Sequence, residues 1–329
     1  MTGWYTITPT GPITIGNLTP VGQNSGQVGC RWPPNGHQLA ACLNLPSHAQ
    51  LWGPFWYCDS TLYVLLPLPV YTLDIAENRT SKESPPQNLY RLVWDEQEQW
   101  QVQSQHQGQE IEVIGGQYLI PINTLEEFWR SQEWSFSSGK PDDNELKHLP
   151  WETLTLSHNS REDFQVKDEG GFFAEMTTLL DPDWSILVKI IGEYEPPKTG
   201  ILGAGTPVTV RSVRGRSRWE NLGAECANPK EAILLTGALW QQPQTKLSCP
   251  TPPGVKGYAA EMGVPWQSWK KVRDRHDPTR RVAVLTPGEW MTPAGAVYLW
   301  AGTSPVSHSG PLPDPFNRHV LGYGHLWLF

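Results

Sequence analysis

The stretch TGILGAGTPVTVRSVRGRSRW, residues 199–219, connects a glycine-rich turn to a strand pattern and then to the densest arginine cluster in the chain. Gly200, Gly203 and Gly205 can adopt backbone angles that are closed to other residues, which lets the main chain turn sharply and approach a ligand. Residues 208–213 then alternate with the two-residue period of a strand. This succession predicts a tight turn and a strand that ends in a cationic segment.

The arginines after this strand favour contact with a polyanion. They lie within eight positions: Arg211, Arg214, Arg216 and Arg218. The preceding turn lacks the spacing of a Walker phosphate loop and of a dinucleotide-binding fingerprint, so we expect no nucleotide cofactor. A second interpretation fits the same residues, namely a β-turn and a solvated strand edge that arginines protect from pairing with other chains.

The charge of the chain changes sign along its length. The net charge is −8, but residues 1–200 hold 11 Lys and Arg against 25 Asp and Glu, whereas residues 201–329 hold 14 against 8. The first part therefore carries −14 and the second +6. Because electrostatic fields at physiological salt act over about 8–10 Å, a basic face can bind phosphates although the whole chain is acidic. Ordinary surface variation is the alternative explanation.

The composition favours a β-rich globular protein. The 329 residues include 31 Pro, 30 Gly and 17 Trp with modest charge, which is typical of short strands linked by ordered turns. The five cysteines have no metal-binding spacing, and their odd number argues against a complete disulfide framework. No signal-peptide pattern opens the chain, and no stretch is long and apolar enough for a membrane helix. We therefore expect a cytoplasmic protein without a bound metal.

A short helix is predicted over residues 37–43, directly after Pro34 and Asn35, because proline and asparagine both favour a helix start. Its amino end lies next to Arg31 in the sequence and has unpaired backbone N–H groups that suit a phosphate. The alternative is a capped helix that serves only the core.

A second basic cluster, WKKVRDRHDPTRR, occupies residues 269–281. Aromatic rings beside cations can stack on bases while the cations neutralise phosphates, so this cluster suits single-stranded nucleic acid. Its candidate contacts are Trp269, Lys270, Lys271 and Arg273. A solvated basic loop is the alternative.

Three local patterns complete the secondary-structure prediction. Thr124 and Glu127 form a capping-box pattern before the helical residues 126–132. Residues 137–145 have the composition of a linker, and residues 319–329 are predicted to form the final strand.

Several segments, in their order along the chain, resemble one family: RWPPNGHQLAACL, LWGPFWYCDSTLYVLLPLPV, SHNSREDFQVKDEGGFFAEMTTL, GILGAGTPVTV, TPAGAVYLW and GYGHLWLF. They are similar to the third subunit of the Cmr module, the type III-B CRISPR effector, in the RAMP superfamily. The resemblance implies an α+β chain with tandem ferredoxin-like (RRM-like) folds, β-rich insertions and many ordered loops. It places one domain at residues 1–136, a linker at 137–150 and a second domain with a basic face at 151–329.

The resemblance also implies a function in antiviral defence. Such a subunit is non-catalytic, binds the 5′ repeat-derived tag of the CRISPR RNA, and contacts the large polymerase-like subunit and a RAMP backbone subunit, with target RNA bound only indirectly. The motif match assigns RNA binding to eight positions: Arg31, Asn35, Gly36, Gln38, Gly203, Gly205, Gly322 and Gly324. The central segment is also similar to the tag-binding subunit of type III-A effectors.

Two other functions fit the sequence. An endoribonuclease of the same superfamily would use His37 as the general base for attack by a 2′-hydroxyl, because repeat-processing members place a catalytic histidine on their first helix. A binding module for proteins or carbohydrates would instead use exposed tryptophans as a contact platform.

Overall fold

The computed structural model describes residues 2–16, 26–28, 30–78, 84–136, 145–159, 161–162, 165–166, 172–242, 244–267, 269–273 and 279–329. These residues form mostly antiparallel β-sheets with few helices, so the α+β class is confirmed. Within the described part, no helix is long and apolar enough to cross a lipid bilayer.

The first sheet has eight strands. Their spatial order is β12 (Lys147–His148), β10 (Tyr118–Pro121), β4 (Thr61–Leu65), β3 (Gln50–Cys58), β17 (Ser185–Ile191), β1 (Thr2–Pro9), β19 (Thr206–Val213) and β18 (Thr199–Leu202). Four strands at its centre, β19, β1, β17 and β3, are all antiparallel to their neighbours. In chain order they are the fourth, first, third and second of this group, and α1 (Gly36–Cys42) lies between the first and the second.

The second sheet has five strands, in the spatial order β21 (Val255–Ala259), β26 (Val297–Trp300), β20 (Glu231–Leu234), β28 (His325–Leu328) and β27 (Gly310–Pro311). Read from β28 to β21, four of its strands are again the fourth, first, third and second in chain order. The same antiparallel arrangement therefore occurs twice along the chain.

Smaller elements surround the two sheets. A four-stranded sheet contains β11 (Glu133–Ser135), β6 (Asn88–Arg91), β5 (Val70–Thr72) and β9 (Glu112–Val113), and α2 (Ile122–Ser131) precedes β11. A three-stranded sheet has the order β13 (Trp151–Asn159), β16 (Phe172–Leu180) and β2 (Gly26–Val28). Four further pairs of strands are β7 (Val93–Trp94) with β8 (Trp100–Gln101), β14 (Arg161–Glu162) with β15 (Gln165–Val166), β22 (Val264–Trp266) with β25 (Glu289–Met291), and β23 (Trp269–Arg273) with β24 (Arg281–Leu285). The 3-10 helices are η1 (Ala76–Asn78), η2 (Ser104–His106), η3 (Ser217–Gly223) and η4 (Arg318–Leu321).

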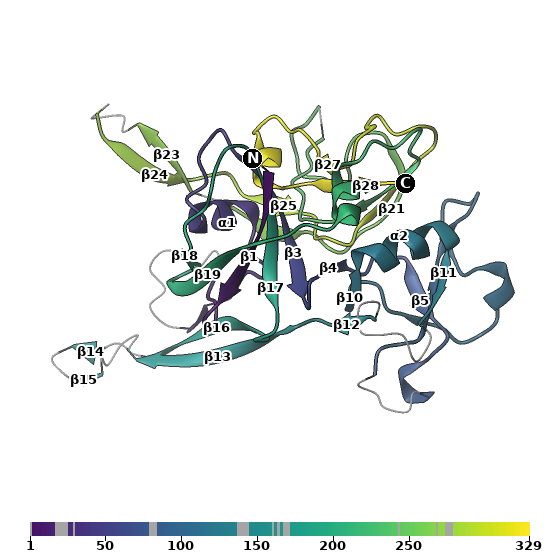
Figure 1. Ribbon diagram of the computed structural model, residues 1–329, viewed down its shortest axis with the longest axis horizontal. Helices are drawn as coiled ribbons and strands as arrows, with labels where there is room; N and C mark the ends of the chain where they lie inside the picture. The colour runs from purple at the N-terminus through teal and green to yellow at the C-terminus, as the bar shows by residue number, and fades with distance from the viewer. Residues whose placement is uncertain are drawn as a thin grey trace.

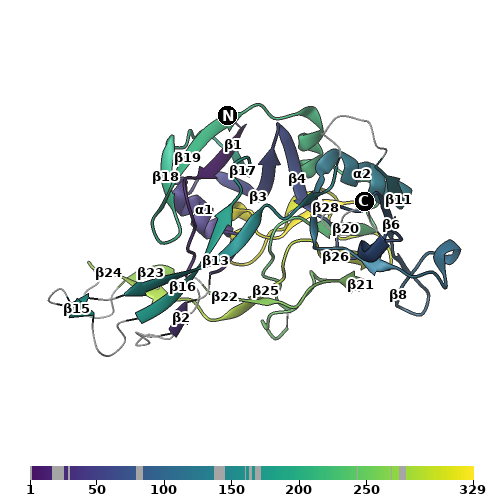
Figure 2. The same cartoon turned by 90° about the horizontal axis from the view of Figure 1, so that it is seen from below.

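The molecule is elongated. Hairpins β13–β16 and β23–β24 extend from one end, and the small sheet with α2 lies at the opposite end (Figure 1). The view from below shows the same arrangement (Figure 2).

The first sheet is buried on both faces. On one face, Ile7 and Val188 pack with Leu39 of α1. On the other face, Phe55 and Leu187 share a core with Ile233 and Trp327 of the second sheet. The two sheets are thus held together by a common apolar core, since apolar burial is the main stabilising contribution to folding.

His325 lies at the centre of this contact between the sheets. Its ring packs edge-on against Trp52 and Phe55 of β3, with ring centroids 5.0 and 5.6 Å apart. Nε2 lies 2.8 Å from the carbonyl oxygen of Leu222, and Nδ1 has no hydrogen-bond partner among the described residues. Desolvation lowers the pKa of His325 from 6.5 to about 4, against the raising effect of the Leu222 carbonyl, while Lys189 lowers it further. The folded protein therefore keeps this ring neutral.

We expect the free energy of unfolding to fall in mild acid because of His325. Above pH 6.5 the ring is neutral in both states. Between pH 6.5 and 4 only the unfolded state binds the proton, so stability falls by about 3 kcal/mol over this window. Urea unfolding at pH 7, 5.5 and 4 measures this fall, and His325→Gln is the matched variant without a titrating ring. Equal pH dependence in both proteins would contradict the prediction.

Some local predictions are confirmed and others are wrong. The first helix and the strand over residues 208–213 are present as α1 and β19. The capping box at Thr124 is wrong, since α2 begins at Ile122 after Pro121 and Thr124 is a buried residue inside the helix. The final strand is shorter than predicted, because residues 318–321 form η4 and left-handed glycines at 322 and 324 interrupt the extended chain.

Strand pairing also crosses the predicted domain boundary. β17 and β19, from the predicted second domain, flank β1 at the centre of the first sheet. Within the predicted linker, residues 137–144 lie outside the described part of the chain, while Lys147–His148 is a strand paired with β10. The two large sheets divide the chain between Val213 and Glu231, since every strand of the first sheet precedes that segment and every strand of the second follows it.

Candidate nucleic-acid interface

The amino end of α1 is built by a capping box. The Asn35 side chain accepts hydrogen bonds from the backbone N–H groups of His37 and Gln38, and the Gln38 side chain accepts one from the backbone N–H of Asn35. Residue 36 is a glycine because α1 contacts η4 at this point. A Cβ at this position would lie 1.9 Å from the carbonyl oxygen of Leu321. The fold itself therefore accounts for three of the predicted RNA contacts: Asn35 and Gln38 cap α1, and Gly36 allows α1 to approach η4. Their contact with RNA stays a prediction.

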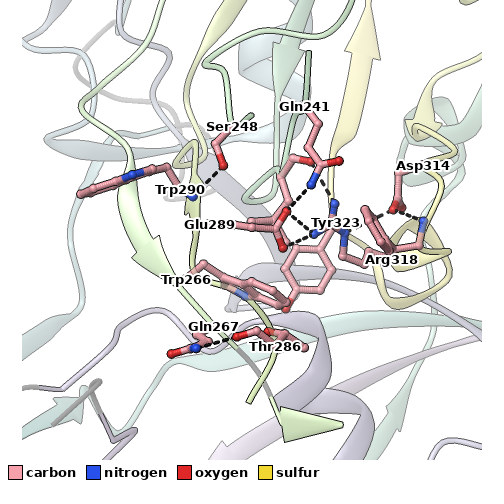
Figure 3. Close-up of polar contacts among 12 residues, drawn as sticks. Gln241, Ser248, Trp266, Gln267, Thr286, Glu289, Trp290, Asp314, Arg318 and Tyr323 are labelled. Carbon is pink, nitrogen blue, oxygen red and sulfur yellow. Dashed lines mark hydrogen bonds and ion pairs between the residues drawn. The ribbon is translucent and has the colours of Figure 1, made fainter. Parts of the chain in front are cut away.

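Arg31 connects this region to the second basic cluster. One of its terminal nitrogens lies 3.4 Å from the carbonyl oxygen of Gln267, just before β23. The Gln267 side chain donates to the carbonyl oxygen of Thr286, just after β24, and so closes the base of the hairpin (Figure 3). The structure thus brings the segment before the first helix into contact with the base of the hairpin. The side chains of Trp269, Lys270, Lys271 and Arg273 lie outside the described part, so their predicted roles stay predictions.

His37 lies where α1 meets the second half of the chain. Its Nδ1 is 2.9 Å from the Tyr323 hydroxyl, which also accepts a hydrogen bond from Trp266 Nε1 at 3.3 Å. Desolvation and the positive charge of Arg318 lower the pKa of His37. Burial strongly raises the pKa of the Tyr323 hydroxyl. Both groups are therefore neutral near pH 7 and form a polar contact between α1 and the loop before β28.

Arg318 holds η4 in place. Its guanidinium binds Glu289 at 2.8 Å and Asp314 at 3.2 Å, and it donates to the carbonyl oxygen of Leu239. The Gln241 side chain donates to the same Glu289 carboxylate at 2.7 Å. Figure 3 shows Arg318 between its two acidic partners, with Tyr323 beside them. Two carboxylates thus surround one buried cation, and the three side chains carry a formal charge of −1, so Arg318 offers no free positive charge to a ligand.

A cleft of about 980 Å³ opens over this network. His37 and Trp266 line its inner part, together with Arg318 and Glu289. Large apolar side chains and one cation line its outer part: Leu247, Trp290, Phe316 and Lys246. Trp290 is 56% exposed and Phe316 is 61% exposed, which is unusual for aromatic side chains of this size.

The sequence analysis did not identify the outer residues of this cleft. Trp290 comes from β25, Phe316 precedes η4, and Lys246 lies in a turn between β20 and β21. No spacing in the sequence links them, because the pairing of β22 with β25 and the ion pair of Arg318 with Glu289 bring them together. Phe316 lies between Pro315 and Asn317, which indicate a turn, whereas Trp290, between Glu289 and Met291, has no comparable local signal.

The predicted glycines have packing or turn roles. Gly203 is left-handed, and a Cβ there would lie 2.1 Å from the carbonyl oxygen of Thr14. A Cβ at Gly322 would lie 2.7 Å from the carbonyl oxygen of Gly53, and one at Gly324 would lie 3.0 Å from Trp240. Gly205 is also left-handed but has open space around it. Their predicted contact with RNA is untested.

The arginines at 211, 214, 216 and 218 are exposed but do not join the cleft. Arg211 pairs with Thr6, which places it on the face of the first sheet opposite to α1. Arg218 forms an ion pair with Glu127 of α2 at 2.8 Å. The predicted cationic sites therefore divide into two surfaces, one beside α1 and the other beside α2.

Among the described residues, no group of three His, Cys, Asp or Glu side chains has a geometry that could hold a metal ion. All five cysteines lie in the described part, and none of them forms a disulfide.

Comparison with known proteins gives weak structural similarities. No family model and no curated protein matches the chain. A chain in a type III-B Cmr-beta structure bound to cognate target RNA has 9% identity and a TM-score of 0.47, with 90% of this chain and 86% of that chain covered. A chain in a Csm3–Csm4 subcomplex of the type III-A CRISPR-Cas interference complex has 9% identity and a TM-score of 0.36, with 92% and 94% covered. A chain in a Csm1–Csm4 cassette in complex with cA4 has 10% identity and a TM-score of 0.31, with 95% and 100% covered. At TM-scores below 0.5, these similarities do not establish a common fold or function.

Proposed function

We propose that this chain is a non-catalytic, RNA-binding subunit of a type III CRISPR effector complex, similar to the third subunit of the Cmr module. In this role it holds the 5′ repeat-derived tag of the CRISPR RNA and connects the large polymerase-like subunit to a RAMP backbone subunit. The order of six sequence segments along the chain supports this proposal.

The observation that carries the proposal is the repeated strand order. A ferredoxin-like unit connects its elements as βαββαβ, and its antiparallel sheet has the spatial order fourth, first, third, second. Both large sheets contain this order. The first unit keeps only the first helix, α1, since residues 192–198 connect β17 to β18 without a helix. In the second unit, η4 replaces the second helix. Tandem RRM-like units account for both sheets.

RNA binding by this chain requires a surface other than an open sheet face. RRM domains stack bases on exposed aromatic residues of the sheet. Here both faces of the first sheet are buried, by α1 and by the second sheet. Loops, helix ends and hairpins at the edges of the units are the available surfaces, and several of the predicted RNA contacts lie there.

The absence of catalysis is part of the proposal. His37 is the strongest candidate for a general base, but its Nδ1 is held by the buried Tyr323 hydroxyl and its pKa is lowered by desolvation. A neutral imidazole can still accept a proton, so activity must be measured directly.

The test uses the full chain assembled with its effector partners. We expect native mass spectrometry to detect this subunit in a complex with RNA that carries the repeat-derived tag, and to detect much less complex with a scrambled tag of equal length. The RNA should remain intact with or without Mg²⁺. Equal occupancy by both RNAs would contradict tag binding, and cleavage that His37→Ala abolishes in a folded protein would favour the nuclease.

A further inference from the structure

The outer part of the cleft has the chemistry of a base-stacking surface. Trp290 and Phe316 expose more than half of their surface at the rim of the same hollow, and Leu247 lies between solvent and the cleft beside them. Exposed aromatic rings that line a hollow are a common way to bind the π-faces of unpaired bases, and they do so with little dependence on sequence. Figure 3 shows the Trp290 ring pointing away from the Arg318–Glu289 network rather than into it.

The inner and outer parts of the cleft differ in charge, as expected for a site that binds an uncharged base inside and a phosphate outside. Two residues that line the inner part, Arg318 and Glu289, form an ion pair 2.8 Å apart whose formal charges cancel, while Asp314, which also binds Arg318, does not line the cleft. The outer cation, Lys246, is exposed and has no ion-pair partner among the described residues. A neutral interior with a cation at the rim fits a base inside and a phosphate outside.

The cleft continues into the basic hairpin. Trp266 lines the cleft and directly precedes Gln267, and Thr286 lines it after β24, so both ends of the β23–β24 hairpin start at its wall. The two strands of this hairpin, residues 269–273 and 281–285, contain four Lys and Arg and no Asp or Glu, a net charge of +4. A polyanion that enters the cleft therefore meets a cationic arm next to it, which is the charge complementarity that favours RNA over an apolar protein segment.

We propose that this cleft binds unpaired nucleotides of single-stranded RNA, with bases stacked on Trp290 and Phe316 and with the backbone passing Lys246 onto the β23–β24 hairpin. The inference rests on the proposed RNA-binding function and gives it a location. The cleft volume of about 980 Å³ lies at the upper end of ligand pockets, so it has room for more than one base. Arg318 is a positioning residue that fixes η4 and Phe316, and it does not contact phosphate.

The test measures the affinity of the full chain for a fluorescent single-stranded RNA that carries the tag, alone and in the assembled complex. Trp290→Ala and Phe316→Ala should each weaken binding by roughly 5- to 100-fold, which is the effect of losing one base–aromatic stack. Trp290→Phe should restore most of the affinity. Lys246→Gln should reduce the slope of log K against log salt by about 0.7, since one phosphate contact is lost.

The matched control is Val113→Ala. Val113 is 50% exposed and apolar, and it lies in β9, away from the residues that line this cleft, so its loss should leave affinity unchanged. Photocrosslinking of RNA that contains 4-thiouridine should place crosslinks on Trp290 or Phe316.

The outcomes separate this inference from the proposed function. If the unsubstituted complex binds tagged RNA, but Trp290→Ala and Phe316→Ala bind it equally well and the crosslinks map elsewhere, the cleft is not the RNA site and the proposed function stands. If these variants lose a partner subunit while RNA affinity is unchanged, the cleft is a protein-docking surface and the inference is wrong. If the unsubstituted complex binds no RNA, both proposals are wrong.

Discussion

Gly36→Ala is expected to destabilise the protein by about 4 kcal/mol or more and to separate α1 from η4. The added Cβ would lie 1.9 Å from the carbonyl oxygen of Leu321 and 2.9 Å from its carbonyl carbon, which is far inside van der Waals contact. Both partners are backbone, so no rotation of a side chain relieves the clash. Effects above about 4 kcal/mol are exceptional for single substitutions and require a steric or electrostatic cause of this kind.

The measurement is urea unfolding of the variant next to Gly11→Ala. Gly11 has open space around the position of a Cβ and does not have a positive φ, so its substitution should change the free energy of unfolding by less than about 0.5 kcal/mol. The two variants therefore separate a clash from the general effect of replacing glycine. Wild-type stability for Gly36→Ala would show that α1 does not approach Leu321 in solution.

The same variant also tests the cleft. When α1 moves away, the 2.9 Å contact between His37 and Tyr323 is lost, and His37 no longer lines the inner cleft. If RNA is bound there, Gly36→Ala should lose RNA affinity under conditions in which it is still folded.

Glu231→Ala is expected to destabilise the protein by about 3–5 kcal/mol. The Glu231 carboxylate receives a hydrogen bond from Arg91 at 2.6 Å and another from Trp129 Nε1 at 3.2 Å. The Arg91 guanidinium lies 4.1 Å from the centre of the Trp129 ring, and its side chain is only 7% exposed. Removing one member of a buried pair leaves the other charge without compensation in an apolar environment.

This ion pair connects the small sheet with α2 to the second large sheet, because Arg91 is in β6 and Glu231 is in β20. We therefore expect Glu231→Ala to increase proteolysis within residues 70–135 first. The double variant Arg91→Met with Glu231→Leu should recover much of the stability, because it buries no unpaired charge. A double-mutant cycle, with the free energy of unfolding measured for both single variants and the double variant, gives the interaction energy between Arg91 and Glu231.

The control is the exposed pair of Lys256 and Glu98. Their charges lie 3.4 Å apart, with side chains 47% and 60% exposed. Exposed pairs contribute about 0–1 kcal/mol, so Lys256→Ala should have a small effect. Equal effects for the buried and the exposed pair would contradict the role of burial.

Patterns within a few residues were sufficient to predict part of this structure. The first helix was predicted at the right place because Asn35 and Gln38 satisfy each other's backbone groups across only three positions. The strand predicted over residues 208–213 likewise has local alternation, and it forms most of β19 (Thr206–Val213). The charge of the C-terminal third also follows from the sequence alone.

A local pattern misled where tertiary contacts decided the outcome. Thr124 has the spacing of a cap, but Ile122, Leu125 and Trp129 bury one face of α2, so the helix extends back to Pro121. The apolar contacts of the whole helix outweigh one capping interaction of about 1 kcal/mol.

The sequence by itself determined the elements whose hydrogen bonds close within a few positions, such as α1 and the glycine turn before β19, together with the charge of each segment. Only the tertiary structure decided that β17 and β19 flank β1, although they lie about 180 and about 200 residues from it in the sequence. It also decided that Arg211 and Arg31 lie on different surfaces, and that Trp290 and Phe316 share one cleft. The physical reason is that long-range pairing depends on which apolar faces fit together after the chain closes its long loops. For such a long-range contact, the local sequence pattern around one residue does not identify its distant partner.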